Sequence, residues 1–367
     1  MSRELHDLIH GGISIPPHLN DIIDTPLFQR LSYITQGTLS SKIFINANHT
    51  RKEHCVGVSH LAGKYSQQLF PDQEKIGKIL RIGGLLHDIG HGPYSHGWDR
   101  TIYSKIYPNE EKGHDEHRKV LLKDYTDILE KHSLTEQDIL NGWGGNLLYQ
   151  SILQGPIGCD RMDFLKRDQL YTNSYEFGSC NIDRIIHNSS IVDTNNGPRL
   201  MYKEEIYPNL ITMLQNRNRM YENIYYHKTS VGLSILLEEA IKQTHDKLKF
   251  VERTKNLNQF VYLTDSIIFE MIPLNEYARK VYQRKILKLE ESDVLYSDFS
   301  PSRIDHEEKV FIWTSSIFSN DYAKEFSKFD IYIQTHQGPV PFKEYWRNQR
   351  ESLNVKEWQL FRVYTEP

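Results

Sequence analysis

The sequence predicts a mainly α-helical fold that ends in a small C-terminal lobe of mixed helix and strand. Up to about residue 250, apolar residues recur at the three- and four-residue spacing of helices that bury one face. Beyond that point, short runs of β-branched and aromatic residues occur at 309–313, 329–333 and 359–364. We therefore expect one large domain over residues 1–250 and a small α/β lobe over residues 251–367.

Three predicted helices carry polar residues at positions that chemistry could use. An apolar stripe over 58–69 places His54 at or near the start of one helix. A second stripe over 76–89 is ended by glycines and a proline, so that His87 and Asp88 lie in its last turn. A third helix is expected from Cys159 to Leu170, with one face formed by Asp160, Phe164 and Asp168 at i, i+4 and i+8.

Two segments interrupt this helical pattern. The stretch 109–114 is strongly polar, and the run 191–201 reads as a hairpin that turns at Asn195, Asn196 and Gly197. Both are expected at the surface.

Composition excludes several classes of function. Hydrophobic residues make up 38% of the 367 residues and charged residues 25%, which is typical of a folded protein. No stretch approaches the roughly 18 apolar residues of a membrane span, and the first residues lack a signal-peptide run, so we expect a cytoplasmic protein, the nucleus not excluded. The net charge of −4 and the lack of a basic tract argue against dedicated nucleic-acid binding, and no P-loop motif is present. The three cysteines form no CxxC pair, so reduced thiols are expected.

The segment 85–96 is the strongest chemical signal. An adjacent imidazole and carboxylate, His87 and Asp88, can bind one divalent ion if other elements bring further ligands. A bare pair of this kind is more often buried or capping. Here the segment also holds His91 and His96, and a structural role for all four residues is improbable.

In these motifs the chain resembles the HD-domain dNTP triphosphohydrolases, most closely the animal members that carry a sterile alpha motif. The resemblance extends from about residue 5 to 230 and implies an HD-domain helical core. It is carried by His10-Gly11, the run Ile-Ile-Asp-Thr-Pro-Leu-Phe-Gln-Arg-Leu at 22–31, Arg-Lys-Glu-His at 51–54, the segment 87–96 and Asp-Arg-Met-Asp-Phe at 160–164. No sterile alpha motif is expected before the match, and the C-terminal lobe looks shorter than in that family.

The resemblance implies four metal ligands, which are His54, His87, Asp88 and Asp160. Taken singly, His54 and Asp160 would be a surface histidine and a helix N-terminal aspartate. Two imidazoles and two carboxylates suit iron, zinc or manganese better than calcium, and we expect Mg²⁺ to accompany a triphosphate. The metal identity is left open.

The resemblance also implies the groups that act on the phosphates. It places His91, His96, Asp99 and His114 around the scissile phosphate. His96 is expected to contact the α-phosphate and to protonate the leaving 5′ oxygen, while Asp99 orients His114. Without the resemblance, His114 would be a solvated loop histidine.

Substrate contacts are implied at seven further positions. Arginines would hold the triphosphate because their planar fork matches phosphate oxygens. Polar and aromatic residues would contact the sugar and base. Read without the resemblance, residues 217–228 form a helix with a charged face and an aromatic core stripe. The seven residues are Gln36, Arg51, Arg161, Phe164, Asp168, Arg217 and Tyr225.

Several positions depart from the family pattern. Phe164 replaces a tyrosine, Arg161 a lysine, and Tyr226 a glutamine beside the nucleotide. Asp24 is kept in the segment that binds a guanine-nucleotide activator in the animal enzymes, but its final arginine is Ser32 here. A nucleotide activator is therefore left open, and a homo-oligomer is expected.

Three functions are compatible with these residues. The first is hydrolysis of a dNTP to a deoxynucleoside and triphosphate. The second is a different HD-domain phosphohydrolase that acts on nucleoside monophosphates, cyclic nucleotides or single-stranded RNA with the same ligands. The third is a non-enzymatic nucleotide sensor or binding scaffold, which predicts a damaged metal site.

Overall fold

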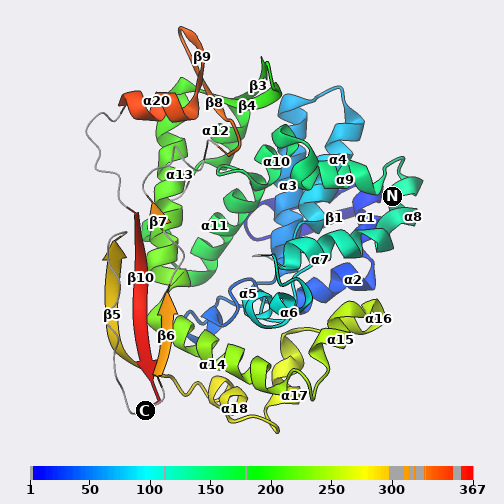
Figure 1. The fold of residues 1–367 in the computed structure, drawn as a ribbon. Helices are drawn as coiled ribbons and strands as arrows, with labels where there is room; N and C mark the ends of the chain where they lie inside the picture. Colours follow the sequence, from blue (N-terminus) through cyan, green and yellow to red (C-terminus); the bar gives the residue numbers. More distant parts are fainter. Residues whose placement is uncertain are drawn as a thin grey trace.

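Helices make up most of the chain, and the predicted fold class is confirmed (Figure 1). The computed structural model describes residues 3–110, 113–177, 180–296, 310–314, 318–319, 326, 328–349 and 357–366. Its helices are α1 Pro17–Ile23, α2 Pro26–Gln29, α3 Arg51–Leu69, α4 Glu74–Leu86, α5 His96–Trp98, α6 Ser104–Ile106, α7 Gly113–Leu121, α8 Thr126–Lys131, α9 Glu136–Leu140, α10 Leu147–Gln154, α11 Cys159–Thr172, α12 Ile182–His187, α13 Tyr207–Met220, α14 Lys228–Thr244, α15 Phe250–Lys255, α16 Leu257–Phe260, α17 Ile268–Met271, α18 Glu276–Tyr282 and α20 Phe342–Gln349.

The described strands form three small sheets. Strands β1 and β2 make an antiparallel hairpin, β3 and β4 continue into β8 and β9, and β10 lies between β5 and β6 and also pairs with β7. The strands are β1 Arg3–Asp7, β2 Gly11–Ile15, β3 Ser189–Thr194, β4 Gly197–Lys203, β5 Lys288–Tyr296, β6 Val310–Thr314, β7 Phe318–Ser319, β8 Tyr332–Thr335, β9 Gly338–Pro341 and β10 Glu357–Thr365. Strands therefore occur near the three C-terminal runs predicted for them.

The three helices expected to carry polar residues are present and pack together, with α3 against both α4 and α11. Glu53 accepts a hydrogen bond from the Thr50 backbone N–H at 3.2 Å, as in a capping box, and so starts α3 three residues before His54. Helix α4 ends at Leu86, so His87 and Asp88 follow directly in the turn that leaves it. Asn173, in the left-handed conformation, ends α11 two residues later than predicted.

Gly90 is needed where the turn after α4 meets α7. A Cβ atom at this position would overlap the carbonyl oxygen of His114 and lie 2.7 Å from the backbone nitrogen of Arg118. The absence of a side chain therefore lets the start of α7, with His114, approach the His87–Asp88 turn.

The two segments predicted at the surface are placed differently. The hairpin forms, with Thr194 paired to Gly197 across Asn195 and Asn196, but most of β4 is buried. Strand β4 also pairs in parallel with β8, where Met201 is opposite Tyr332. In the polar stretch, His114 is buried, because its ring and backbone bind Asp99. The hairpin turn and residues 109–110 of the polar stretch are exposed, as predicted, whereas the surface prediction was wrong for most of β4 and for His114, which contact β8 and Asp99.

The division at residue 250 stays a prediction. Helices α15 to α18 continue the helical part to Tyr282, and β5 begins at Lys288. The three cysteines are free, and Cys55 and Cys159 are buried. Among the described residues, none of the helices combines the length and apolarity required to cross a bilayer.

Acid is expected to destabilise the fold through His117 in α7. Burial among Tyr103, Tyr107 and Phe260 lowers the pKa of His117 to about 3, whereas an unfolded histidine has a pKa of about 6.5. Its contribution to stability is thus complete above pH 6.5 and is lost as the pH falls toward 3, because the unfolded state binds the proton first. His117→Phe should therefore reduce the slope of unfolding free energy against pH by up to about 1.4 kcal/mol per pH unit between about pH 6 and 4. Urea unfolding across this range tests this, and parallel curves for the variant and the wild type would contradict it.

Candidate active site

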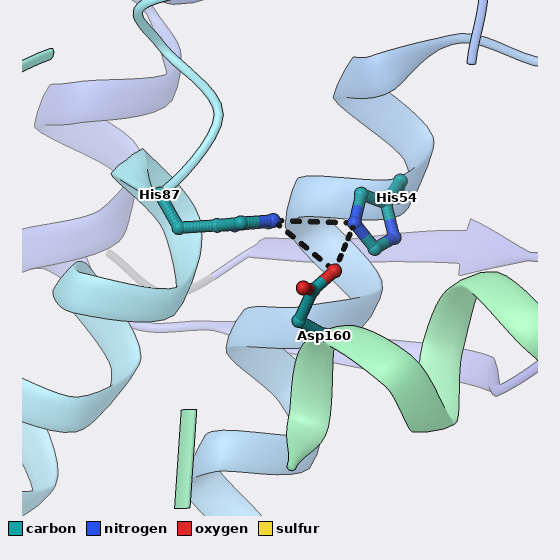
Figure 2. A group of neighbouring side chains, drawn as sticks. All are labelled: His54, His87 and Asp160. Carbon is teal, nitrogen blue, oxygen red and sulfur yellow. Dashed lines mark hydrogen bonds and ion pairs between the residues drawn. The ribbon is translucent and has the colours of Figure 1, made fainter. Parts of the chain in front are cut away.

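Three predicted ligands converge on one point (Figure 2). The Nε2 atoms of His54 and His87 lie 3.2 Å apart, and Asp160 Oδ1 lies 3.1 Å from the first and 3.6 Å from the second. They come from α3, the turn after α4 and the first turn of α11. Their ligand atoms are close enough together to hold one metal ion.

The far nitrogen of each imidazole is already bound. Nδ1 of His54 lies 2.8 Å from Asp163 Oδ2, and Nδ1 of His87 lies 2.7 Å from the Gly84 carbonyl oxygen. A carbonyl accepts only, and so does the ionised Asp163 carboxylate, so each Nδ1 carries a proton and each Nε2 is left to bind a proton or a metal ion. Two Nε2 atoms and a carboxylate oxygen that face one another require positive charge among them, as protons or as a metal ion, and this donor set fits a divalent transition-metal ion.

Carboxylates dominate the electrostatics of this cluster. Burial disfavours a charge on His54, yet hydrogen bonds to Asp160 and Asp163 raise its pKa to about 10. Burial likewise opposes a charge on His87, and the neighbouring Asp88 raises its pKa to about 10. Despite burial, hydrogen bonds from His54 and His87 hold the pKa of Asp160 well below its usual range. The same negative field favours a bound cation.

Asp88 lies at the edge of the three-ligand group. Its Oδ1 is 3.3 Å from His87 Nε2, and its Oδ2 is 3.9 Å from His54 Nε2 and pairs with Nη1 of Arg51. The Arg51 Nε atom donates a second hydrogen bond to Ser95 Oγ at 2.8 Å. Asp88 therefore connects the candidate metal ligands to an arginine on α3.

A second cluster of imidazoles lies directly beside Asp88. His91 Nε2 is 3.4 Å from Asp88 Oδ1, and the His91 ring stacks on His114 with centroids 3.8 Å apart. The Asp99 carboxylate accepts hydrogen bonds from the backbone N–H of His114 at 3.0 Å, from its Nδ1 at 2.8 Å and from His96 Nδ1 at 3.1 Å. Burial opposes ionisation of Asp99, but these bonds hold its pKa well below the usual range. The four predicted catalytic residues are thus in contact, and the solvated-loop interpretation of His114 was wrong.

The predicted face of α11 is also formed. Beyond Asp160, the Phe164 ring lies between His54 and Tyr225, with centroid distances of 6.4 and 6.3 Å. One turn further, Asp168 accepts a hydrogen bond from the Tyr225 hydroxyl at 2.5 Å, and its other oxygen lies 2.6 Å from His49 Nε2. Phe164, Asp168 and Tyr225 therefore line one continuous strip that leads away from the metal ligands.

The remaining predicted contacts are less tightly placed. The Gln36 backbone N–H donates to the His49 carbonyl at 3.0 Å, and among the described residues its buried Oε1 has no hydrogen-bond partner. Arg217 lies over the Tyr221 ring at 5.2 Å, and Tyr221 contacts Tyr225 at 4.9 Å. Arg161 follows Asp160 directly in α11 and is partly buried.

Four residues in contact with the site were given no role from the sequence. Asp163 binds His54, and Arg167 and His10 bind Asp163 at 2.9 and 2.7 Å. His49 binds Asp168 from 119 residues away. The i, i+4 spacing of Asp163 and Arg167 was the one local signal available, since it is typical of an ion pair on a helix.

Comparisons with known proteins agree with this geometry. The HD domain family matches residues 51–143, which include His54, His87 and Asp88. A deoxynucleoside triphosphate triphosphohydrolase SAMHD1 homolog of Dictyostelium discoideum is 27% identical over 94% of this chain and 69% of that protein. A putative HD domain-containing protein of Acanthamoeba polyphaga mimivirus is 32% identical over 74% of this chain and 65% of its own length.

The fold itself has a counterpart among solved structures. The crystal structure of a hypothetical protein from Aquifex aeolicus matches with a TM-score of 0.77 and 24% identity, and the match covers 100% of this chain and 97% of that one. Taken with the sequence matches, the chain contains an HD domain and is homologous, over most of its length, to the SAMHD1-type deoxynucleoside triphosphate triphosphohydrolases.

Proposed function

We propose that this hydrolase of the HD superfamily converts a dNTP and water to a deoxynucleoside and triphosphate. The proposal is carried by the closeness of two clusters. The metal-ligand atoms of His54, His87 and Asp160 form the first, and the Asp99–His114 pair belongs to the second. Asp88 and His91 lie between them. Hydrolysis of a phosphate ester needs an activated water and a proton donor for the leaving oxygen within reach of one phosphorus. The two clusters supply a place for each.

His54, His87 and Asp160 would hold the metal ion, with Asp88 as the fourth ligand. The donor set fits iron, zinc or manganese, and Mg²⁺ would accompany the triphosphate. A divalent ion bound there supplies Lewis acidity, which makes water more acidic and offsets phosphate charge.

The neighbouring imidazoles hold and move the protons. Because Asp99 accepts from Nδ1 of both His96 and His114, each ring keeps Nε2 for exchange with the substrate. His96 is the most accessible of the group, with its side chain 59% exposed, and would protonate the leaving 5′ oxygen. Partial burial lowers the pKa of His96, while the hydrogen bond to Asp99 opposes that shift and would hold the ring in orientation for the transfer, and His91 would complete the phosphate contacts.

The strip beyond Asp160 would receive the nucleoside. Phe164 and Tyr225 offer ring faces for the sugar and base, while Asp168 and the buried Oε1 of Gln36 are acceptors for a sugar hydroxyl. Arg51, Arg161 and Arg217 would balance the phosphate charge.

Product analysis tests the proposal against its alternative. Metal-loaded protein is incubated with each dNTP, and with nucleoside monophosphates, cyclic nucleotides and single-stranded RNA, and the products are separated by chromatography. Release of deoxynucleoside with intact tripolyphosphate is expected. Cleavage of the other substrates with dNTPs left intact would instead establish a different HD-domain phosphohydrolase.

Asp99→Asn is expected to lower kcat for dNTP hydrolysis by about 10²- to 10⁴-fold, the range for loss of an oriented acid–base group. The amide would place an N–H donor against the imidazoles and favour the wrong tautomer. KM should change little, and the ion bound by His54, His87 and Asp160 should be retained, because Asp99 is outside that group. Glu116→Gln on α7, which pairs with Lys119, is the control. A kcat for Asp99→Asn equal to that of the control would contradict the assigned role.

A further inference from the structure

Asp265 lies where two loops of the site meet. It begins the short 3₁₀ turn η9, Asp265–Ile267, far from the site residues in sequence. Its Oδ2 accepts hydrogen bonds from the backbone N–H and the hydroxyl of Thr35 at 2.9 and 2.7 Å. Its Oδ1 accepts from the backbone N–H of Tyr94 at 2.7 Å. One carboxylate thus binds both loops, with one oxygen on each.

Each of the two loops leads into a residue with its own role in the proposed reaction. Thr35 immediately precedes Gln36, which is proposed above to contact the sugar through its buried Oε1. Tyr94 and Ser95 immediately precede His96, and the Ser95 hydroxyl is held by Arg51. Apart from Asp265, a long hydrogen bond of 3.4 Å from Thr38 Oγ1 to the Tyr94 carbonyl also joins them.

The backbone of both loops is held in an unfavourable conformation. Thr38, Tyr94 and Ser95 have φ values of 51°, 55° and 52°, and they are three of the eight non-glycine residues with positive φ in the described chain. Such values are uncommon for L-residues, and a β-branched threonine adopts them least readily. Segments of this kind persist only where the surrounding contacts hold them.

The chemistry of the contact requires a carboxylate. Thr35 and Tyr94 present donors to both oxygens, so an asparagine could satisfy only one loop and would turn its own N–H₂ toward donors of the other. Burial raises the pKa of Asp265, while the hydrogen bonds from Thr35 and Tyr94 lower it. Burial is the larger effect, so the pKa of Asp265 lies above its usual value, and these bonds limit that shift.

We propose that Asp265 is a positioning residue that couples the Gln36 loop to the His96 loop and so fixes the sugar contact relative to the proton donor. The functional half of this inference rests on the proposed dNTP hydrolysis, whereas the coupling of the loops does not. Asp265 acts through these loops, since its hydrogen bonds are to Thr35 and Tyr94 and not to the proposed metal ligands.

Hydrogen–deuterium exchange tests the coupling without substrate. Asp265→Asn should accelerate exchange about tenfold in the peptides that contain Thr35 and Tyr94. In the variant, the backbone N–H of each residue either loses its hydrogen bond to a charged oxygen or faces the N–H₂ group of the new asparagine. Thr35→Val is a milder variant that removes one hydrogen-bond donor, and it serves if Asp265→Asn does not fold. It is expected to accelerate exchange at Tyr94 in the opposite loop. Glu270→Gln is the control, because within the described residues the Glu270 carboxylate in α17 accepts its hydrogen bonds from Arg253.

Kinetics then separate positioning from a merely structural role. In a wild type that hydrolyses dNTP, Asp265→Asn should lower kcat about 10- to 100-fold and also change KM, with metal affinity as in the wild type. If the wild type did not hydrolyse dNTP, the proposed function would be wrong, but the exchange test of the loop coupling would still apply. Exchange that rises in only one loop, or no response at Tyr94 to Thr35→Val, would overturn the coupling. If Asp265→Asn lowered only the fraction of enzyme molecules that are active and left KM unchanged, the positioning role would be overturned.

Discussion

Asp160→Ala is expected to give a folded protein that no longer retains a divalent metal and hydrolyses dNTP at least about a thousandfold more slowly, as is typical when a central catalytic group is lost. Asp160 supplies the carboxylate oxygen that faces both Nε2 atoms, at 3.1 and 3.6 Å. Without it, two imidazoles and Asp88 would have to hold the ion. The side chain is partly exposed in the first turn of α11, so its loss leaves no large cavity.

Metal content after dialysis, circular dichroism and initial rates measure these effects together. Asp183→Ala is a matched control, because Asp183 also lies in the first turn of a helix, α12, but pairs with the surface residue Lys64. Full metal content in Asp160→Ala would contradict the assigned ligand set.

Gly57→Ala is expected to destabilise the fold by about 3–5 kcal/mol, the cost of disrupting a buried ion pair combined with overpacking. A Cβ atom at Gly57 would overlap Asp163 Oδ1 and lie 2.6 Å from Arg167 Nη2. Both side chains are 0% exposed and bound to one another, so neither can move aside. Displaced Asp163 would also release His54 Nδ1, and metal affinity should fall about 10- to 100-fold.

Gly63→Ala on the same helix is the control. There a Cβ atom would lie 3.2 Å from the Cδ of Arg81, a flexible side chain that can shift. This substitution should be neutral or stabilising by up to about 1 kcal/mol through helix propensity. Urea unfolding and metal titration of the pair test the argument, and equal midpoints would contradict it.

Local patterns predicted the helices of the site well. The apolar stripe after His54 predicted the start of α3 closely, and the glycines and proline after Asp88 predicted the end of α4 closely. Hydrophobic periodicity and helix-breaking residues determine helix boundaries within a few residues, so both are visible in the local sequence. The spacing of Asp160, Phe164 and Asp168 likewise predicted a face that the structure contains. The choice of these residues as a metal and substrate site came from the resemblance, since any one of them has an ordinary structural interpretation.

Contacts between distant segments could not be predicted from local patterns. His49 reaches Asp168 across 119 residues, and Asp265 reaches Thr35 across 230. The pairing of β4 with β8 likewise depends on a strand far along the chain, which is why a buried strand looked like a surface hairpin. His114 was surrounded by polar neighbours in sequence, yet Asp99 and the approach at Gly90 determine its burial.

Phosphorus-31 NMR of dGTP hydrolysis in oxygen-18 water tests the central claim most directly. If the two clusters act on the α-phosphorus, tripolyphosphate should grow in at the rate of deoxynucleoside release, with the label on a terminal phosphorus and none in the deoxynucleoside. The signal should be absent from Asp160→Ala. Orthophosphate, pyrophosphate or dGDP as the first product, or label in the 5′ hydroxyl, would contradict the proposed reaction.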